Sequence, residues 1–188
     1  MKRVGSILCS LVMLMALCAA RVGAEGNGLT LGNVAAAAKG KVIVPLLLEI
    51  ESEDVRVGHI AATVGYDADV ITFQQSEKGF LLEGVGGKVT VTPKVDGAKS
   101  TVDVDIVTEA EPNQPRRALR KGLVVSLVFK VNEKAAADTK VPLLLSAVKL
   151  ETPDAEPKAI EPLKLTPGEV AVLSPENVPF VSCFFFTH

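Results

Sequence analysis

Two aspartates, Asp103 and Asp105, stand two residues apart and are the clearest candidates for chemistry in this 188-residue chain. They lie in a segment that alternates apolar and polar residues, and on a β-strand both carboxylates would point to one face, about 7 Å apart. Such a pair could bind a metal through oxygen ligands, calcium above all, or act as an acid/base pair. Because the neighbouring sequence supplies no third ligand, we favour a solvated sheet face and predict no metal or other cofactor on this chain.

Histidine is the other residue type that could support catalysis, and the chain holds two, His59 and the terminal His188. A hydrolytic triad would place His59 beside a serine and a carboxylate, but no Gly-x-Ser-x-Gly pattern marks such a serine. The stretch from Gly84 to Lys88 is rich in glycine, but its lysine is not followed by Ser or Thr, as a phosphate-binding loop requires. We therefore predict that the protein is not an enzyme and that His59 is an exposed strand residue.

The segments that carry these residues have the pattern of β-strands. From Val42 to Val172, short runs of β-branched and aliphatic residues recur between Gly, Pro, Asp and Asn, which is typical of an all-β sandwich or barrel. Asp96-Gly97 predicts a hairpin between 88–95 and 100–107. Alternation over 57–66 and 100–107 predicts one buried apolar face and one outward face. The residues on that outward face are His59, Ala61, Thr63, Thr101, Asp103 and Asp105.

Several other segments carry local signals. Residues 41–50 form an apolar run, in which Pro45 predicts a strand near a sheet boundary. The alanine run 35–38 is too short to hold a helix alone, so we expect an edge strand followed by a turn. Residues 79–84 predict a loop whose aromatic residue and leucines enter the core. The phenylalanines assigned to the core are Phe73, Phe80 and Phe129.

Residues 1–24 have the layout of a secretory signal peptide, with Lys2 and Arg3 before an apolar run and small residues ending at Ala24. An uncleaved anchor would need about 20 apolar residues, which this run does not provide. A lipoprotein signal at Cys18 lacks a small preceding residue. We expect a mature chain that begins at Glu25, leaves the cytoplasm and has no stable membrane span. It would be secreted or periplasmic, with attachment to the cell surface as an alternative.

The remaining sequence is typical of one domain, 25–174, followed by an apolar tail, 175–188, whose role is unassigned. Only Cys183 remains after cleavage, so no internal disulfide is available and the core must stabilise the domain. The formal net charge is −2, with both signs mixed along the chain, which argues against a nucleic-acid partner. The absence of Trp and the single Tyr leave few aromatic rings for stacking on sugars.

The order of these motifs resembles the cohesin family. The matching pieces, in chain order, are Val42-Ile43-Val44-Pro45, Val57-Gly58 with Val64-Gly65-Tyr66-Asp67, Val70-Ile71-Thr72-Phe73, Gly79-Phe80-Leu81-Leu82, Gly122-Leu123-Val124 with Phe129-Lys130-Val131, and Gly168-Glu169-Val170-Ala171-Val172. Together they span nearly the whole mature chain. The resemblance implies a nine-stranded β-sandwich of jelly-roll topology, related in fold to a group of carbohydrate-binding modules.

The resemblance also implies a function and a surface that performs it. Cohesins grip dockerins, small calcium-loaded helical modules attached to polysaccharide-degrading enzymes, through one flat sheet face. Calcium is therefore expected on a dockerin-like partner rather than on this chain. Aligned on Tyr66-Asp67, the implied partner-binding face consists of His59, Ala61, Thr63, Thr90, Thr92, Thr101, Asp103, Asp105 and Glu109.

Two residues of that face depart from the pattern of cellulosomal cohesins. Ala61 stands where those proteins often carry an acidic residue, and Asp105 falls where they carry an apolar contact. The same fold could therefore serve a different ligand. The alternatives are a carbohydrate-binding module of related fold, with a polysaccharide as its ligand, and a structural element of a cell-surface or secretion assembly.

Overall fold

The computed structural model describes residues 26–110, 116–174 and 176. The predicted signal peptide, 1–24, lies outside the described residues, and so does the apolar tail, 175–188, apart from Glu176. Within the described part of the chain, no helix is long and apolar enough to cross a membrane.

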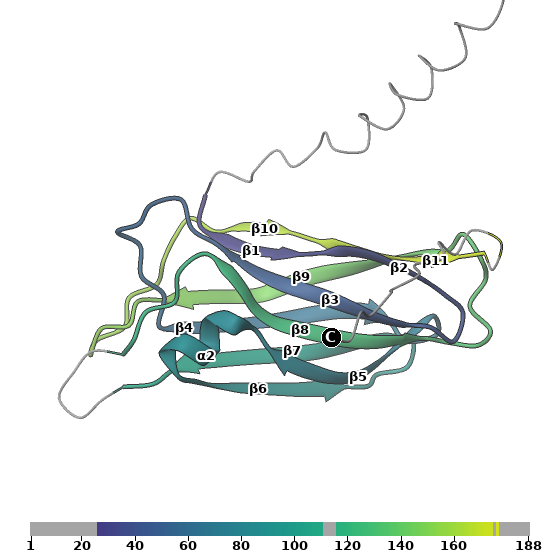
Figure 1. The fold of residues 1–188 in the computed structure, drawn as a ribbon, viewed down its shortest axis with the longest axis horizontal. Helices are drawn as coiled ribbons and strands as arrows, with labels where there is room; N and C mark the ends of the chain where they lie inside the picture. Colours follow the sequence, from purple (N-terminus) through teal and green to yellow (C-terminus); the bar gives the residue numbers. More distant parts are fainter. Residues whose placement is uncertain (1–25, 111–115, 175, 177–188) are drawn as a thin grey trace, which may run out of the picture.

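Two β-sheets pack face to face and enclose the core (Figure 1). One sheet has five strands in the order β10 (Lys164–Thr166), β1 (Gly28–Leu31), β3 (Lys41–Glu49), β8 (Gly122–Val131) and β5 (Ile71–Lys78). The other has six, in the order β2 (Asn33–Ala37), β11 (Gly168–Leu173), β9 (Lys140–Glu151), β4 (His59–Asp67), β7 (Lys99–Thr108) and β6 (Gly87–Lys94). The predicted all-β sandwich is confirmed, with eleven strands in the described residues instead of nine.

The strand count rises partly because the chain changes sheets at Gly32. β1 pairs with β3 in the five-stranded sheet, whereas β2, which contains part of the alanine run, pairs with β11 in the six-stranded sheet. A Cβ atom at Gly32 would lie 2.6 Å from Cγ of Pro45, so only glycine fits where the chain crosses between the layers. The alanine run is an edge strand as predicted, since β2 is the outermost strand of its sheet.

The core lies between the inner faces of the two sheets and follows the predicted alternation. Ile60, Ala62 and Val64 of β4 are buried, and so are the alternate residues Val102, Val104 and Ile106 of β7. Aromatic rings link the two layers. The ring of Phe129 packs edge-to-face on Tyr66, at 5.2 Å between centroids, and on Phe73, at 5.7 Å.

Pro45 does not mark a sheet boundary, so that prediction is wrong. β3 lies between β1 and β8 in the middle of its sheet. The Pro45 carbonyl accepts a hydrogen bond from the Gly32 amide, 3.0 Å away and just past the end of β1. Since a strand residue directs its nitrogen and its carbonyl to the same side, the missing N–H of Pro45 faces the end of β1, and pairing with β8 is undisturbed.

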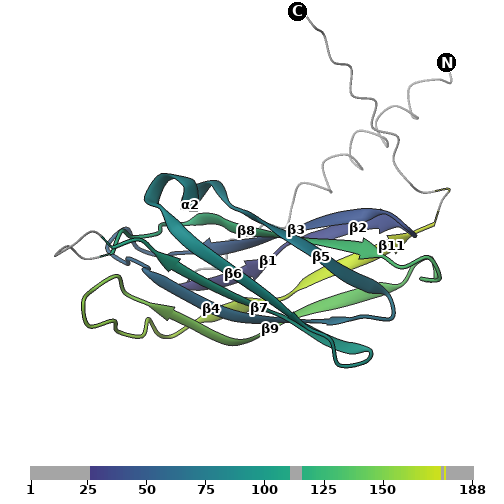
Figure 2. The ribbon, with the colours of Figure 1, turned by 90° about the horizontal axis from the view of Figure 1, so that it is seen from below.

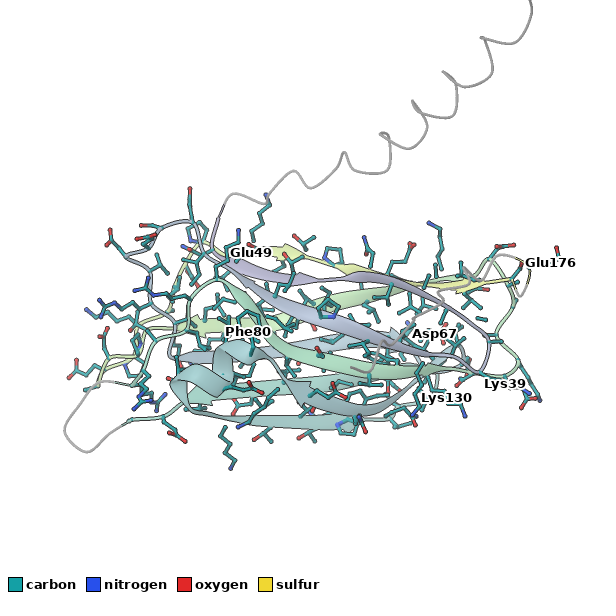
Figure 3. All side chains as sticks on the ribbon, in the orientation of Figure 1. Lys39, Glu49, Asp67, Phe80, Lys130 and Glu176 are labelled. Carbon is teal, nitrogen blue, oxygen red and sulfur yellow. The ribbon has the colours of Figure 1, made fainter. Side chains whose placement is uncertain are left out.

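Residues 80–85 form a short helix, α2 (Phe80–Val85), where the sequence predicted a loop. The Gly79 amide donates to the Val124 carbonyl at 2.9 Å, which ties the helix start to β8. Leu82 enters the core as predicted, but Phe80 is 64% exposed, so its assignment to the core is wrong (Figure 3). A helix turns successive residues about 100° apart, and only one side of this one meets the core.

Candidate functional site

The outer face of the six-stranded sheet collects the site residues predicted from the sequence. β9, β4, β7 and β6 lie side by side on this layer (Figure 2). Directly paired strand residues point to the same face, and β4 pairs Ala61 with Asp105 and Thr63 with Asp103. β6 continues these two rows with Thr90 opposite Asp105 and Thr92 opposite Asp103. The predicted face is therefore a continuous surface across three strands.

His59 joins three strands of this surface through its imidazole ring. Its Nε2 lies 2.8 Å from Oδ1 of Asp105 on β7, and its Nδ1 lies 2.6 Å from Oε2 of Glu151 on β9. Glu151 also forms an ion pair with Lys149, whose Nζ lies 2.6 Å from the second carboxylate oxygen of Glu151. Only 19% of the His59 side chain is exposed. His59 is therefore a mostly buried bridge between carboxylates, and the prediction of an exposed strand residue is wrong.

The charges around His59 favour its protonated form. Burial of the ring lowers its pKa, but the hydrogen bonds and negative charges of Asp105 and Glu151 outweigh burial, and the pKa lies above its ordinary value of 6.5. The Lys149 ammonium and then the His59 ring hold the pKa of Glu151 below its ordinary value. An imidazolium can donate to both carboxylates at once, whereas the neutral ring has one N–H.

Asp103 belongs to a second group of polar contacts on the same face. Its carboxylate accepts a hydrogen bond from the Thr63 hydroxyl at 2.8 Å and forms an ion pair with Nζ of Lys94 at 2.5 Å. The Lys94 ammonium, followed by the Thr63 hydroxyl, lowers the pKa of the Asp103 carboxyl. We call His59, Thr63, Asp103, Asp105 and Glu151 the polar centre.

The two aspartates do not converge on one point. Asp103 faces Thr63 and Lys94, whereas Asp105 faces His59. Among residues 26–110 and 116–174, no group of three or more His, Cys, Asp and Glu side chains is placed to hold a metal ion. His59 hydrogen bonds to carboxylates through both ring nitrogens, which leaves neither one for a nucleophile.

The remaining predicted residues extend the face toward both ends of β7. Thr101 pairs with Gly65 on one side and Lys94 on the other. Glu109 follows the other end of β7 and, together with Thr90 and Asp105, lines an open groove of about 640 Å³. Glu109 also packs closely on Gly86, since a Cβ atom added to Gly86 would lie 2.3 Å from Oε2 of Glu109. All nine predicted residues thus lie on or beside one surface.

An apolar groove adjoins the polar centre where β4 ends. It measures about 500 Å³, and its lining includes Gly65, Ala98, Pro142 and Leu144. Leu144 is 57% exposed, and it pairs in register with Gly65, which has no side chain to cover it. Asp67 and Lys99 lie at the rim and oppose each other in register. We call Gly65, Ala98, Pro142 and Leu144 the apolar groove.

Sequence reasoning missed every contribution of β9 to this surface. β9 pairs Lys149 with Ala61 but Ser146 with Thr63, so residues 147 and 148 together oppose Ala62. This β-bulge contains Ala147, whose φ of 48° is left-handed. It shifts the alternation by one residue, so that Leu144 and Lys149 share the outer face. The charged residues at the two ends of 140–151 could have indicated an exposed face for this strand. A strict alternation, however, places Leu144 on the buried face with Leu150.

Solved protein structures resemble this fold, although no family profile matches the chain and no curated protein matches it. The sixth cohesin of scaffoldin B from Acetivibrio cellulolyticus, solved with a dockerin, is 21% identical, with a TM-score of 0.61 over 78% of this chain and 99% of that one. The seventh type I ScaB cohesin from Pseudobacteroides cellulosolvens is 16% identical, with a TM-score of 0.64 over 84% and 98%. A non-cellulosomal cohesin from the archaeon Archaeoglobus fulgidus is 17% identical, with a TM-score of 0.58 over 80% and 93%.

These similarities confirm the cohesin-type fold predicted from the sequence. They span nearly the full length of each solved domain. At such identities the likeness concerns the fold, whereas binding depends on the side chains of a site.

Proposed function

We propose that this chain is a secreted, non-catalytic docking module that binds a dockerin-like protein through the outer face of β9, β4, β7 and β6. In this proposal residues 1–24 are removed as a signal peptide, and residues 25–174 form the docking domain. The partner carries any calcium and connects the module to an extracellular assembly, such as one that degrades polysaccharides.

The observation that carries the proposal is the continuous outer face of these four strands. Its side chains stand in register, and it displays the polar centre beside the apolar groove. A surface with an apolar part and polar surroundings is typical of protein–protein interfaces. Solved cohesins of this fold have been determined in complex with dockerins, which supports the choice of partner.

A lack of catalysis fits the contacts of the polar centre. Its hydrogen bonds and ion pairs join protein groups to one another, and His59 and Asp103 each have two partners. A catalytic base needs a free lone pair directed at a substrate. We therefore assign the polar centre to recognition.

Carbohydrate binding is the second candidate, and Phe80 is the observation that favours it. The Phe80 ring is 64% exposed on α2, and an exposed aromatic ring can stack on a sugar face. This candidate predicts saturable binding to a polysaccharide, lost in the Phe80→Ala variant. The docking face is not involved, so the two candidates can be separated.

A binding screen tests the proposed function directly. The full purified chain is titrated with a panel of calcium-loaded dockerins, including those of its own genome, and in parallel with a panel of soluble glycans. We expect 1:1 saturable binding to at least one dockerin, which is lost when EDTA unfolds the calcium loops of the dockerin. Binding to glycans with no binding to any dockerin would overturn the proposal.

A further inference from the structure

The polar centre cannot by itself supply much affinity for a partner. Asp103 and Glu151 already face cations, and Asp105 faces the His59 ring. A partner that competes for these groups must replace contacts that exist before binding. Electrostatic complementarity between partners contributes to association rate and selectivity more than to affinity. The main source of affinity should therefore lie elsewhere on this face.

The apolar groove meets the requirements of an anchor site. Leu144 and Pro142 present exposed apolar surface, and Gly65 leaves bare backbone between Leu144 and Thr101. Affinity in protein interfaces concentrates at a few large side chains that fill such hollows. The groove is continuous with the polar centre through the β4 residues Thr63 and Gly65, so one partner can cover both.

The charges around the groove select an uncharged occupant. Asp67 and Lys99 are the charged residues in its lining, and their opposite charges face each other in register on β4 and β7. The rim therefore has no net charge that would attract an ionic side chain. Moving a charged group from water into an apolar site is strongly unfavourable. An aliphatic or phenyl side chain fits both the lining and the charge balance.

We propose that the apolar groove is the anchor pocket of the docking face and receives one large apolar side chain, leucine, isoleucine or phenylalanine, from a helix of the docked module. This inference rests on the proposed docking function for its partner. It assigns the largest share of the affinity to Leu144, Pro142, Ala98 and Gly65, which lie outside the residues predicted from the sequence. It leaves the polar centre to select among partners.

The first experiment uses small probes and needs no dockerin. The ¹⁵N-labelled full chain is titrated by NMR with N-acetyl-leucinamide, N-acetyl-lysinamide and N-acetyl-aspartamide. We expect weak, saturable shifts at the amides of Gly65, Ala98 and Leu144 with the leucine probe alone, and their loss in Leu144→Asp. Equal shifts with all three probes, or no shift at these amides, would overturn the anchor pocket and leave the docking proposal intact.

The second experiment measures affinity for a calcium-loaded dockerin that binds in the screen. Leu144→Asp should weaken binding at least about tenfold, because it places a charge in the apolar groove. Ile43→Asp is a matched control, since Ile43 is 54% exposed on the outer face of the other sheet, against 57% for Leu144. Equal affinities for both variants would overturn the inference.

Sedimentation addresses a competing occupant of the groove. If the groove joined two copies of this chain, the wild type would be a dimer and Leu144→Asp a monomer. That result would also overturn the proposal. We expect both proteins to sediment as monomers.

Discussion

The polar centre and the apolar groove are neighbours on one sheet face, yet they are built in opposite ways. In the polar centre, side chains from β4, β7 and β9 reach across to one another, as His59 does to Asp105 and Glu151. In the apolar groove, Gly65 has no side chain to reach with, and Leu144 beside it is left exposed. The polar groups of the polar centre are paired within the protein, whereas the apolar surface of the groove is shielded from water only when a partner covers it.

This difference separates two properties that a docking face must have. Exposed apolar surface contributes free energy roughly in proportion to the area it buries, and the groove can provide it. Charged side chains that are already paired contribute little net affinity, but they penalise a partner whose charges do not match. We infer that the groove sets how tightly a partner binds and the polar centre sets which partner binds.

The largest expected effect comes from filling the apolar groove with the protein's own side chain. A Cβ atom at Gly65 would lie 3.9 Å from the Leu144 carbonyl oxygen, an ordinary contact, so Gly65→Phe fits the strand without strain. Its ring would occupy the groove and lower dockerin affinity at least about tenfold, or about 1.4 kcal/mol. The thermal midpoint should stay the same or rise, because glycine weakens a strand interior.

Calorimetric titration and thermal unfolding of Gly65→Phe check these two expectations together. Gly65→Ala is the matched control, since it removes glycine from β4 without filling the groove. Undiminished affinity of Gly65→Phe would break the comparison, because the groove would then be irrelevant to docking.

A smaller effect concerns the dependence of stability on pH in the polar centre. The pKa of His59 is raised in the folded state, so its contribution is complete below the unfolded value of 6.5 and is lost as pH rises through the folded pKa. The pKa values of Asp103 and Glu151 are lowered, so their contributions are present above their ordinary values, 3.8 and 4.5, and are lost as pH falls through the folded values.

The polar centre should therefore stabilise the fold most between roughly pH 5 and 6.5. Above that window, the wild type should lose more unfolding free energy than His59→Gln does, because only the wild type carries an imidazolium that deprotonates. Urea unfolding of both proteins from pH 4 to 9 measures the difference. Parallel pH profiles for the two proteins would show that His59 is not held by its carboxylates.

The smallest effect concerns the hydrogen bond between Thr63 and Asp103. A double-mutant cycle with Thr63→Val and Asp103→Asn should give a coupling of about 0.5 kcal/mol in unfolding free energy, because the pair is partly open to water. A coupling near zero in this double-mutant cycle would mean that the contact between Thr63 and Asp103 adds nothing to stability.

Alternation in the sequence was enough to predict the fold class and the outward face of β4 and β7. In those strands each buried residue alternates with an outward one, so the pattern alone places Thr63 and Asp103 together. The Asp96-Gly97 turn was likewise enough to predict that β6 pairs with β7. Gly97 has the left-handed φ, 58°, that such turns require.

The rest of the site depends on features that alternation does not contain. The bulge at Ala147 reverses the phase of β9, so a pattern with a strict period of two cannot place both Leu144 and Glu151 on the outer face. The contact between His59 and Glu151 joins residues 92 positions apart, so only the sheet order reveals it. Phe80 was misplaced because a six-residue helix is too short to show its period in the sequence.

One measurement tests most directly the claim that the outer face of the six-stranded sheet is the docking surface. Ala61→Arg places a long cation at the centre of that face, between Lys149 and Asp105, and Gln75→Arg places the same side chain on the outer face of the other sheet. Both are titrated by calorimetry with the calcium-loaded dockerin that binds the wild type. We predict at least about a tenfold loss of affinity for Ala61→Arg and wild-type affinity for Gln75→Arg, and the reverse ranking or equal affinities would contradict the account.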